Sequence, residues 1–383
     1  MADTTWYVDP DASKLNDGTS WTNAFENLVG ATSLQTALDK ANDVDNTTIY
    51  VRHSVSTSFD MSTGTGLVQT LGGSPWSGSP QTQKWVKIIA CDAAGDPITS
   101  RGTYVTIKAT AAVTNMISYT GGDPQKVCWY GFFFDGNGQT ATDILHNNNE
   151  SSAAMYGHNF FNCKFSDADN YLALLGSECR NWNFIDCDFG EVGLGAGSWH
   201  PTLSHNGGCF LRCKFILDMQ YAVYVSTNYN LLFEDCIFDA QGDQYCVRLN
   251  ASYGIRFVNC AFVNFNVAAI NSDDAKNFPY LHNCYAEGDD AANDEWMDAK
   301  NADDPIIGLA FRCASNLQNG LFDDGIYVPD PYRLAADELF DNESDVGPIS
   351  TTDHRLKDRV LAYKGGEDFW GNRALIGPEY GSA

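Results

Sequence analysis

Short runs of alternating apolar and polar residues recur along the middle of this chain. Tyr221–Val225, Tyr245–Leu249 and Val267–Ile270 stand between clusters of Gly, Asn and Asp. Alternation that uses aromatic and β-branched residues predicts β-strands, and these repeats lack the i, i+3, i+4 apolar spacing of helices. The middle of the chain is therefore expected to consist of short strands.

Six cysteines set the period of these strands. They follow one another at steps of 24, 26, 23, 24 and 24 residues, at Cys163, Cys187, Cys213, Cys236, Cys260 and Cys284. A Phe stands two residues after all but the last of them. A fixed period of this size indicates a solenoid, and about 24 residues at roughly 3.3 Å each make one coil of short strands. The predicted fold is an all-β, right-handed parallel β-helix, because crossovers between parallel strands are nearly always right-handed.

The residue before each of these cysteines is Asn or Asp in all copies but one, where it is Arg212. Asn and Asp tolerate the left-handed backbone conformation, so this position predicts a sharp bend between strands. Charges also alternate beside the cysteines, with Lys164, Asp188 and Lys214 directly after three of them. Opposite charges on adjacent coils would stabilise the stack by a few tenths of a kcal/mol per pair.

The two ends of the chain depart from the repeat. Residues 1–48 contain a strand at Trp6–Val8 and a helix over 32–42 with Leu34, Ala37, Leu38 and Ala41 on one face. We expect this segment to cap the β-helix, because an open strand edge invites aggregation. The β-helix itself is predicted over 49–315, with regular coils over 155–290, and residues 316–383 are predicted to close the other end.

The composition limits the partners and the compartment. The chain has 49 acidic and 23 basic residues, a formal net charge of −26, so nucleic acids are not expected partners. No run of 18 apolar residues exists, and the first residues lack the pattern of a signal peptide. In-register cysteines on parallel strands do not converge as a disulfide requires. We therefore expect neither membrane insertion nor disulfides. Reduced thiols fit folding in a reducing cytoplasm, and the alternative is that a leader segment has been removed.

Motifs at both ends resemble a known group of proteins. The sequence resembles bacterial right-handed β-helix proteins of the pectate-lyase-like superfamily at Trp6–Asp9, Asp17–Trp21, Ala24–Phe25, Leu34–Leu38, Ile49–Val51, Asp368–Arg373 and Ile376–Tyr380. The resemblance implies the β-helix fold. It does not select a function, because the superfamily contains lyases, hydrolases, adhesins and phage spikes.

Charged residues beside the repeat are the candidates for catalysis. A lyase-like site needs acids that hold Ca²⁺ and a basic residue, and the candidates are Asp186, Asp188, Arg212, Lys214 and Asp235. A stabilising charge ladder explains the same residues and is the favoured interpretation. A polygalacturonase-like site is not supported, because Asp273 and Asp274 lack an accompanying Gly-His-Gly or Arg-x-Lys element.

Two groups of residues are candidates for glycan binding. Trp199, His200 and His205 lie in a predicted loop within the regular coils, and loops on a rigid scaffold often carry binding sites. The alternative is a loop that merely folds over the flank with Trp199 as its anchor. Tyr224 and Arg248 are predicted to occupy equivalent outward positions on consecutive coils, where they form either a glycan contact or an ordinary surface pair.

Acidic residues after the last regular coil are the candidates for a metal site. Asp289, Asp290, Asp294 and Glu295 supply the oxygen ligands that Ca²⁺ prefers, but their spacing lacks the D-x-D-x-D-G loop pattern. Solvated acidic loops are the favoured interpretation, so no cofactor is expected, with Ca²⁺ as the alternative.

These observations leave two functions open. The favoured one is a non-catalytic bacteriophage virion protein of the decoration, fibre or spike type, located at the virion or extracellular surface. Its partners would be glycans and other virion or surface proteins, and a homotrimer is compatible with it. The alternative is a secreted polysaccharide lyase or glycoside hydrolase on the same fold.

Overall fold

The computed structural model describes residues 3–12, 15–27, 33–41, 46–52, 58–62, 66–70, 85–120, 126–139, 143–147, 155–156, 158–169, 171–175, 179–190, 201–203, 207–216, 221–226, 230–272, 279–289, 294–299, 308–311, 313–315 and 326–327. The chain divides into two units, Met1–Pro201 and Thr202–Ala383, and each is described by itself.

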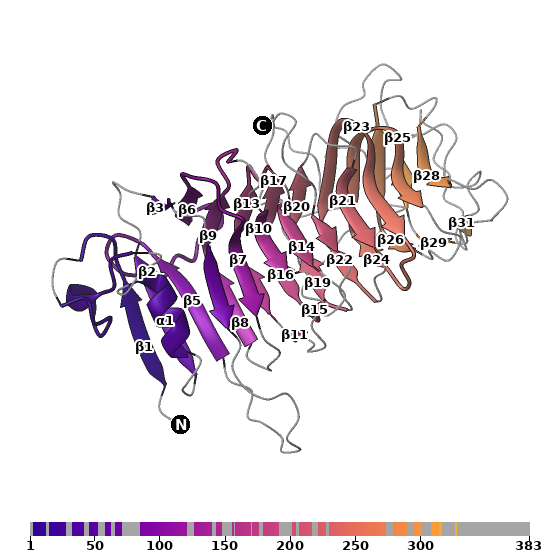
Figure 1. Ribbon diagram of the computed structural model, residues 1–383. Helices are drawn as coiled ribbons and strands as arrows, with labels where there is room; N and C mark the ends of the chain where they lie inside the picture. The colour runs from indigo at the N-terminus through magenta and orange to yellow at the C-terminus, as the bar shows by residue number, and fades with distance from the viewer. Residues whose placement is uncertain are drawn as a thin grey trace. The chain divides into compact units, whose positions relative to one another are not determined.

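Unit 1 contains one parallel sheet made of a strand from each successive coil (Figure 1). In order across the sheet, its strands are β1 (Thr4–Val8), β2 (Thr47–Arg52), β5 (Trp85–Cys91), β8 (Lys126–Tyr130), β12 (Asn159–Phe161) and β16 (Asn183–Ile185). The remaining strands pair with their equivalents in the same parallel way. One series is β3 (Phe59–Met61), β6 (Val105–Ala109), β9 (Phe132–Asp135), β13 (Lys164–Ser166) and β17 (Asp188–Gly190). A second series is β4 (Leu67–Thr70), β7 (Asn115–Thr120), β10 (Asp143–Asn147) and β14 (Ala173–Leu175). A separate two-stranded sheet consists of β11 (Met155–Tyr156) and β15 (Cys179–Arg180).

Unit 2 repeats this organisation. Its first sheet contains β19 (Cys209–Leu211), β22 (Leu232–Glu234), β24 (Arg256–Val258), β26 (Tyr280–His282), β29 (Gly308–Phe311) and β31 (Ile326–Tyr327). The other strands are β18 (Thr202–Leu203), β20 (Lys214–Ile216), β21 (Tyr221–Ser226), β23 (Ile237–Asn250), β25 (Ala261–Ser272), β27 (Tyr285–Gly288), β28 (Glu295–Ala299) and β30 (Ala314–Ser315). The pairings between these strands that the structure describes are parallel as well.

The register of both units follows the predicted period. Phe160 pairs with Phe184 in unit 1, and Phe210, Phe233 and Phe257 pair in succession in unit 2. The paired rings stack inside the coils with centroids 5.0 to 5.1 Å apart, and all five side chains are fully buried. The fold is therefore a parallel β-helix, and its right-handed sense follows the rule for parallel crossovers.

The bends between strands have the predicted left-handed backbone. The residue before each repeat cysteine has a φ between 48° and 56°: Asn162, Asp186, Arg212, Asp235, Asn259 and Asn283. Arg212 adopts it at φ 53° although it lacks the short polar side chain that favours this conformation. A turn at 135–138 also contains a left-handed residue, Asn137, at φ 52°.

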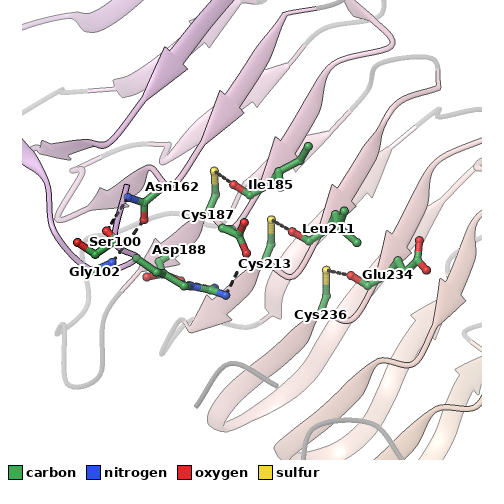
Figure 2. Close-up of polar contacts among 12 residues, drawn as sticks. Ser100, Gly102, Asn162, Ile185, Cys187, Asp188, Leu211, Cys213, Glu234 and Cys236 are labelled. Atoms are coloured by element: carbon green, nitrogen blue, oxygen red, sulfur yellow. Dashed lines mark hydrogen bonds and ion pairs between the residues drawn. The ribbon is translucent and has the colours of Figure 1, made fainter. Parts of the chain in front are cut away.

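The six repeat cysteines are buried and free, as predicted. Each thiol also has a hydrogen-bonding role that the sequence did not reveal, because it lies near the carbonyl oxygen of the residue two positions before it. A second carbonyl oxygen, from the preceding coil, lies near the thiols of Cys163, Cys187, Cys236, Cys260 and Cys284. Figure 2 shows the local contact for Cys187, whose Sγ lies 3.5 Å from the Ile185 oxygen. In unit 2, the thiol of Cys236 donates to the oxygens of Glu234 at 3.4 Å and of Phe210 at 3.3 Å.

The N-terminal segment contains the predicted helix as α1 (Leu34–Ala41), after the short 3-10 helix η1 (Trp21–Asn23). Leu34, Ala37, Leu38 and Ala41 are all buried, so the predicted apolar face is confirmed. Its role as a cap remains a prediction. Except for residues 326–327, the predicted closing segment lies outside the described residues. Within the described part of the chain, no helix has the length and apolar character to cross a membrane.

Candidate functional site

In unit 1, the candidate acids Asp186 and Asp188 are held by a cation that the sequence did not suggest. Nη1 of Arg101 lies 3.3 Å from Oδ1 of Asp186, and Nη2 lies 3.5 Å from Oδ1 of Asp188. The turn that carries Arg101 is fixed by Asn162, whose amide donates to the Ser100 carbonyl at 3.1 Å (Figure 2). No periodic signal marks Arg101, because it precedes the regular coils.

A tyrosine completes this turn cluster, which we define as Arg101, Tyr104, Asp186 and Asp188. The Tyr104 hydroxyl donates to Oδ2 of Asp188 at 3.2 Å. Burial, followed by the Asp188 charge, raises the pKa of Tyr104 well above its ordinary value. The phenol therefore stays protonated near neutral pH and acts as a donor to Asp188 rather than as a base.

The predicted register of opposite charges on adjacent coils is present in unit 1. Lys164 and Asp188 occupy paired positions on β13 and β17. The Lys164 ammonium lies 4.7 Å from the centroid of the Phe133 ring, so it also makes a cation–π contact. Since Asp188 already accepts from Arg101 and Tyr104, the cluster has the features of a structural clamp between the turn and the strands.

The other catalytic candidates belong to unit 2. Arg212 and Asp235 occupy the left-handed bends, and Lys214 begins β20, where it pairs with Ile237 and is buried. The alternation of charge therefore does not continue to the coil after Lys214. Oδ1 of Asp235 accepts from the Asn259 amide at 3.1 Å, and Oδ1 of Asn259 accepts from Asn283 at 2.8 Å. Asp235 thus heads a ladder of bend side chains.

Tyr224 and Arg248 form a polar and aromatic surface on unit 2, at paired positions on β21 and β23, as predicted. The guanidinium carbon of Arg248 lies 5.2 Å from the Tyr224 ring centroid and 5.3 Å from that of Tyr221. Nη1 of Arg248 donates to the Tyr221 hydroxyl at 2.9 Å, and the Asn250 amide donates to the Tyr224 hydroxyl at 3.0 Å. We call Tyr221, Tyr224, Arg248 and Asn250 the tyrosine–arginine platform.

The platform combines preorganised donors with partly exposed aromatic surface. Tyr224, Arg248 and Asn250 are half-buried, whereas Tyr221 is buried and orients the guanidinium. Sequence reasoning missed Tyr221 and Asn250, although both lie on the strands that supply the predicted pair. The predicted loop residues Trp199, His200 and His205 lie outside the described residues.

The structure describes the side chains of two of the metal candidates, Asp289 and Asp294 of unit 2. Burial and then the Asp239 charge raise the pKa of Asp289, and Asp294 is fully buried beside Gly288. Asp290 and the side chain of Glu295 lie outside the description. Among the residues described, no three His, Cys, Asp or Glu side chains are gathered as a metal site would require. Because Asp290 and the side chain of Glu295 lie outside the description, the Ca²⁺ alternative stays a prediction.

A carboxylate–histidine pair in unit 1 escaped the sequence reasoning. Oδ2 of Asp143 lies 2.7 Å from Nδ1 of His146 on strand β10, and Oδ1 of Asp143 accepts from the Tyr171 backbone at 3.1 Å. Asp143 is buried and the His146 side chain is 31% exposed. A buried carboxylate that orients a partly exposed imidazole is an arrangement used in proton transfer. Its only sequence signal is the i, i+3 spacing.

Comparisons with known proteins find similarity of structure alone. No family model matches the chain, and no curated protein matches it either. Among solved structures, it is similar to the A-module of a mannuronan C-5 epimerase from Azotobacter vinelandii, at 12% identity over 84% of this chain and 91% of that one, with a TM-score of 0.43. It is similar to the ORF18 protein of Geobacillus virus E2, at 12% identity over 72% of this chain and 58% of that one, with a TM-score of 0.42.

A rhamnogalacturonan lyase is similar at 14% identity, over 97% of this chain and 99% of that one, with a TM-score of 0.36. These similarities are too distant to assign a family or an activity. We therefore take the function from the residues of this chain.

Proposed function

We propose that this protein is a non-catalytic, glycan-binding β-helix protein of a virion surface. The tyrosine–arginine platform carries the proposal. Aromatic surface packs against the apolar C–H faces of sugars, while guanidinium and amide groups donate to their hydroxyls. Arg248 and Asn250 are held in place by hydrogen bonds to Tyr221 and Tyr224, so little side-chain freedom would be lost on binding.

The turn cluster supports the absence of catalysis at the candidate acids. Asp186 and Asp188 share one guanidinium and Asp188 also accepts from Tyr104, so structural contacts already occupy Oδ1 of Asp186 and both carboxylate oxygens of Asp188. The free, buried cysteines support folding in a reducing compartment, as expected for a virion protein assembled inside its host.

Isothermal titration against a panel of neutral and uronic-acid oligosaccharides tests the binding. We expect Tyr224→Ala and Arg248→Ala to weaken binding about tenfold, which is roughly 1.4 kcal/mol. Arg256→Ala and Tyr280→Ala are matched controls, because these residues lie on the other sheet of unit 2 and should leave the affinity unchanged. Wild-type protein that binds no member of the panel contradicts glycan binding. Purified virions of the source phage that do not contain the protein would contradict the virion location.

A carbohydrate-active enzyme is the second candidate, and the Asp143–His146 pair is the observation that favours it. Reducing-end and unsaturated-product assays on the same panel distinguish the two functions. If the protein is an enzyme, turnover should be lost in both His146→Gln and Asp143→Asn, with the fold retained. The binding proposal expects no turnover in wild type or in any variant.

A further inference from the structure

A hollow of about 340 Å³ lies on the outer face of the first sheet of unit 1. Strands β1, β2, β5 and β8 or the residues next to them supply its lining, which includes Asp3, Asn46, Thr48, Trp85, Lys87 and Tyr130. Its volume falls within the range of small-molecule sites. None of these residues belongs to the tyrosine–arginine platform, the turn cluster or the Asp143–His146 pair.

The hollow has an aromatic wall held in a fixed position. The backbone N–H of Trp85 donates to Oδ1 of Asn46 at 3.1 Å, which anchors the start of β5 to the residue before β2. The Tyr130 ring stacks on Phe161 with centroids 4.6 Å apart and planes within 3°. Trp85 and Tyr130 are both half-buried, so each packs on the protein and keeps some surface exposed.

The polar groups of the hollow match the hydroxyls of a sugar. A hydroxyl both donates and accepts, so a saccharide site needs donors and acceptors together. The Lys87 ammonium, the Thr48 hydroxyl and the Asn46 amide donate, and the Asp3 carboxylate accepts. Thr48 and Lys87 stand in register on consecutive coils, so their backbones lie roughly 4.8 Å apart along the stack.

Charge selects between the two classes of saccharide. The residues described in the lining include one side chain that is negatively charged at neutral pH, Asp3, and one that is positively charged, Lys87. Their charges cancel, so the lining has no net charge. The whole chain has a formal net charge of −26, which repels polyanions. Both facts favour an uncharged ligand over a uronic-acid polymer.

We infer that this hollow is a second glycan subsite, which binds a neutral saccharide of about one or two sugar rings. The inference rests on the proposed glycan-binding function, and adds to it a separate site and a ligand class. Trp85 provides the apolar surface for a sugar face, and Thr48, Lys87 and Asn46 donate to its hydroxyls.

Titration of the full chain with neutral gluco-, manno- and galacto-oligosaccharides, and with uronic-acid oligomers of equal length, tests the inference. We expect Trp85→Ala, Lys87→Gln and Thr48→Ala to weaken binding of a neutral member at this site about tenfold or remove it. Trp85→Phe should retain most of the affinity. Thr5→Ala is the matched control, because Thr5 is exposed and pairs with Thr48 in the same outward row but does not line the hollow.

The two sites are separated by stoichiometry. Wild-type protein should bind two ligands, and Lys87→Gln and Tyr224→Ala should each weaken or remove binding at one of the two sites and leave the affinity of the other unchanged. Binding that depends on Tyr224 and is unchanged by the Trp85, Lys87 and Thr48 variants overturns the second subsite and leaves the proposed function intact. Preference of this site for uronic-acid oligomers overturns the ligand class. No binding by the wild-type protein overturns both proposals.

Because Lys87 is exposed, its variant should fold normally, and an unchanged melting temperature confirms that binding alone is tested.

Discussion

Nη1 of Arg101 lies 3.3 Å from Oδ1 of Asp186, a residue 85 positions later in the chain. The contact joins a turn of an early coil to a left-handed bend of a later one. It also places the guanidinium between two acids, since Asp188 lies 3.5 Å from Nη2. Residues that the sequence offers as catalytic acids are thereby tied to a single structural cation.

Replacing Arg101 should therefore destabilise the protein without affecting glycan binding. In Arg101→Ala, two carboxylates lose their shared partner, and we expect a loss of about 1–2 kcal/mol because the groups are partly exposed. Chemical denaturation measures the change. Arg256→Ala, at an exposed position, should stay within about 0.5 kcal/mol of wild type. Equal stability of both variants would show that the clamp contributes nothing.

His158 should make the protein sensitive to acid. Its ring is fully buried and lies 4.6 Å from the rings of both Tyr119 and Trp182, and its Nδ1 accepts from the Val127 backbone. Burial lowers the pKa of His158 to about 3. Between about pH 6.5 and 3 the unfolded chain takes up a proton that the folded protein does not, so stability falls as the pH falls.

The full effect is roughly 4–5 kcal/mol, from about 1.4 kcal/mol per unit of pKa. His158→Gln keeps a hydrogen-bond acceptor but cannot titrate. Its unfolding free energy, followed from pH 8 to pH 4, should fall less steeply than that of wild type. Parallel curves for the two proteins would contradict a neutral, buried imidazole.

Glu287 should have the opposite effect. Burial is the main cause that raises the pKa of Glu287 to about 7, and the nearby Asp289 charge adds to it, while the hydrogen bond from Tyr285 opposes it. The folded protein therefore holds a proton that the unfolded chain releases near pH 4.5. Stability from this group is present below that pH and is lost as the pH rises through about 7.

Glu287→Gln should gain roughly 2–3 kcal/mol relative to wild type between pH 4.5 and 8. The measurement is the difference in unfolding free energy between the two proteins at each pH. In Tyr285→Phe the donor to Oε2, 3.0 Å away, is lost, so the transition should move to higher pH. A difference that does not vary with pH would contradict the raised pKa.

The sequence predicts the repeat but not the contacts that cross from irregular segments. The cysteine period gives the strand register, the left-handed bends and the buried Phe columns, because each coil places equivalent residues in equivalent surroundings. It also places Tyr224 beside Arg248, since both follow the same register. Arg101 lies in a turn without that period, so its contact with Asp186 depends on the path of the loop.

The hollow beside Trp85 was missed for a related reason. It lies in early coils, where insertions change the coil length and no repeated neighbour marks an outward position. In these coils the alternation of residues predicts the strands. Which side chains come together on the surface depends on the register between coils of unequal length. Thr48 and Lys87, for example, lie 39 positions apart in the sequence and become neighbours because β2 pairs with β5.

The cysteine column should tolerate a neutral hydrogen-bond donor better than a charged side chain. The thiol of Cys236 is buried and donates to carbonyl oxygens of its own bend and the preceding coil. Cys236→Asp would bury a carboxylate near those oxygens and should cost several kcal/mol, about 3 or more. Cys236→Ser keeps a donor and should cost less, and denaturant unfolding compares the two. Mass spectrometry of unreduced protein that finds disulfides among the six repeat cysteines would contradict the register itself.

Substitutions of Arg212 test whether this residue has a structural role in the left-handed bend or a catalytic role. It occupies the left-handed bend at φ 53°, where Asn259 and Asn283 stand in later coils of unit 2. For an L-residue without a short polar side chain this conformation costs about 1–2 kcal/mol, a penalty that Asn largely avoids. Arg212→Asn should therefore be more stable than Arg212→Ala by roughly 1 kcal/mol, because both variants lose the same guanidinium and differ in their tolerance of the bend. Thermal and denaturant unfolding measure this difference, and glycan binding should be unchanged in both. Equal stability of the two variants would contradict the backbone argument, and turnover in wild type that both variants abolish would establish Arg212 as part of an active site.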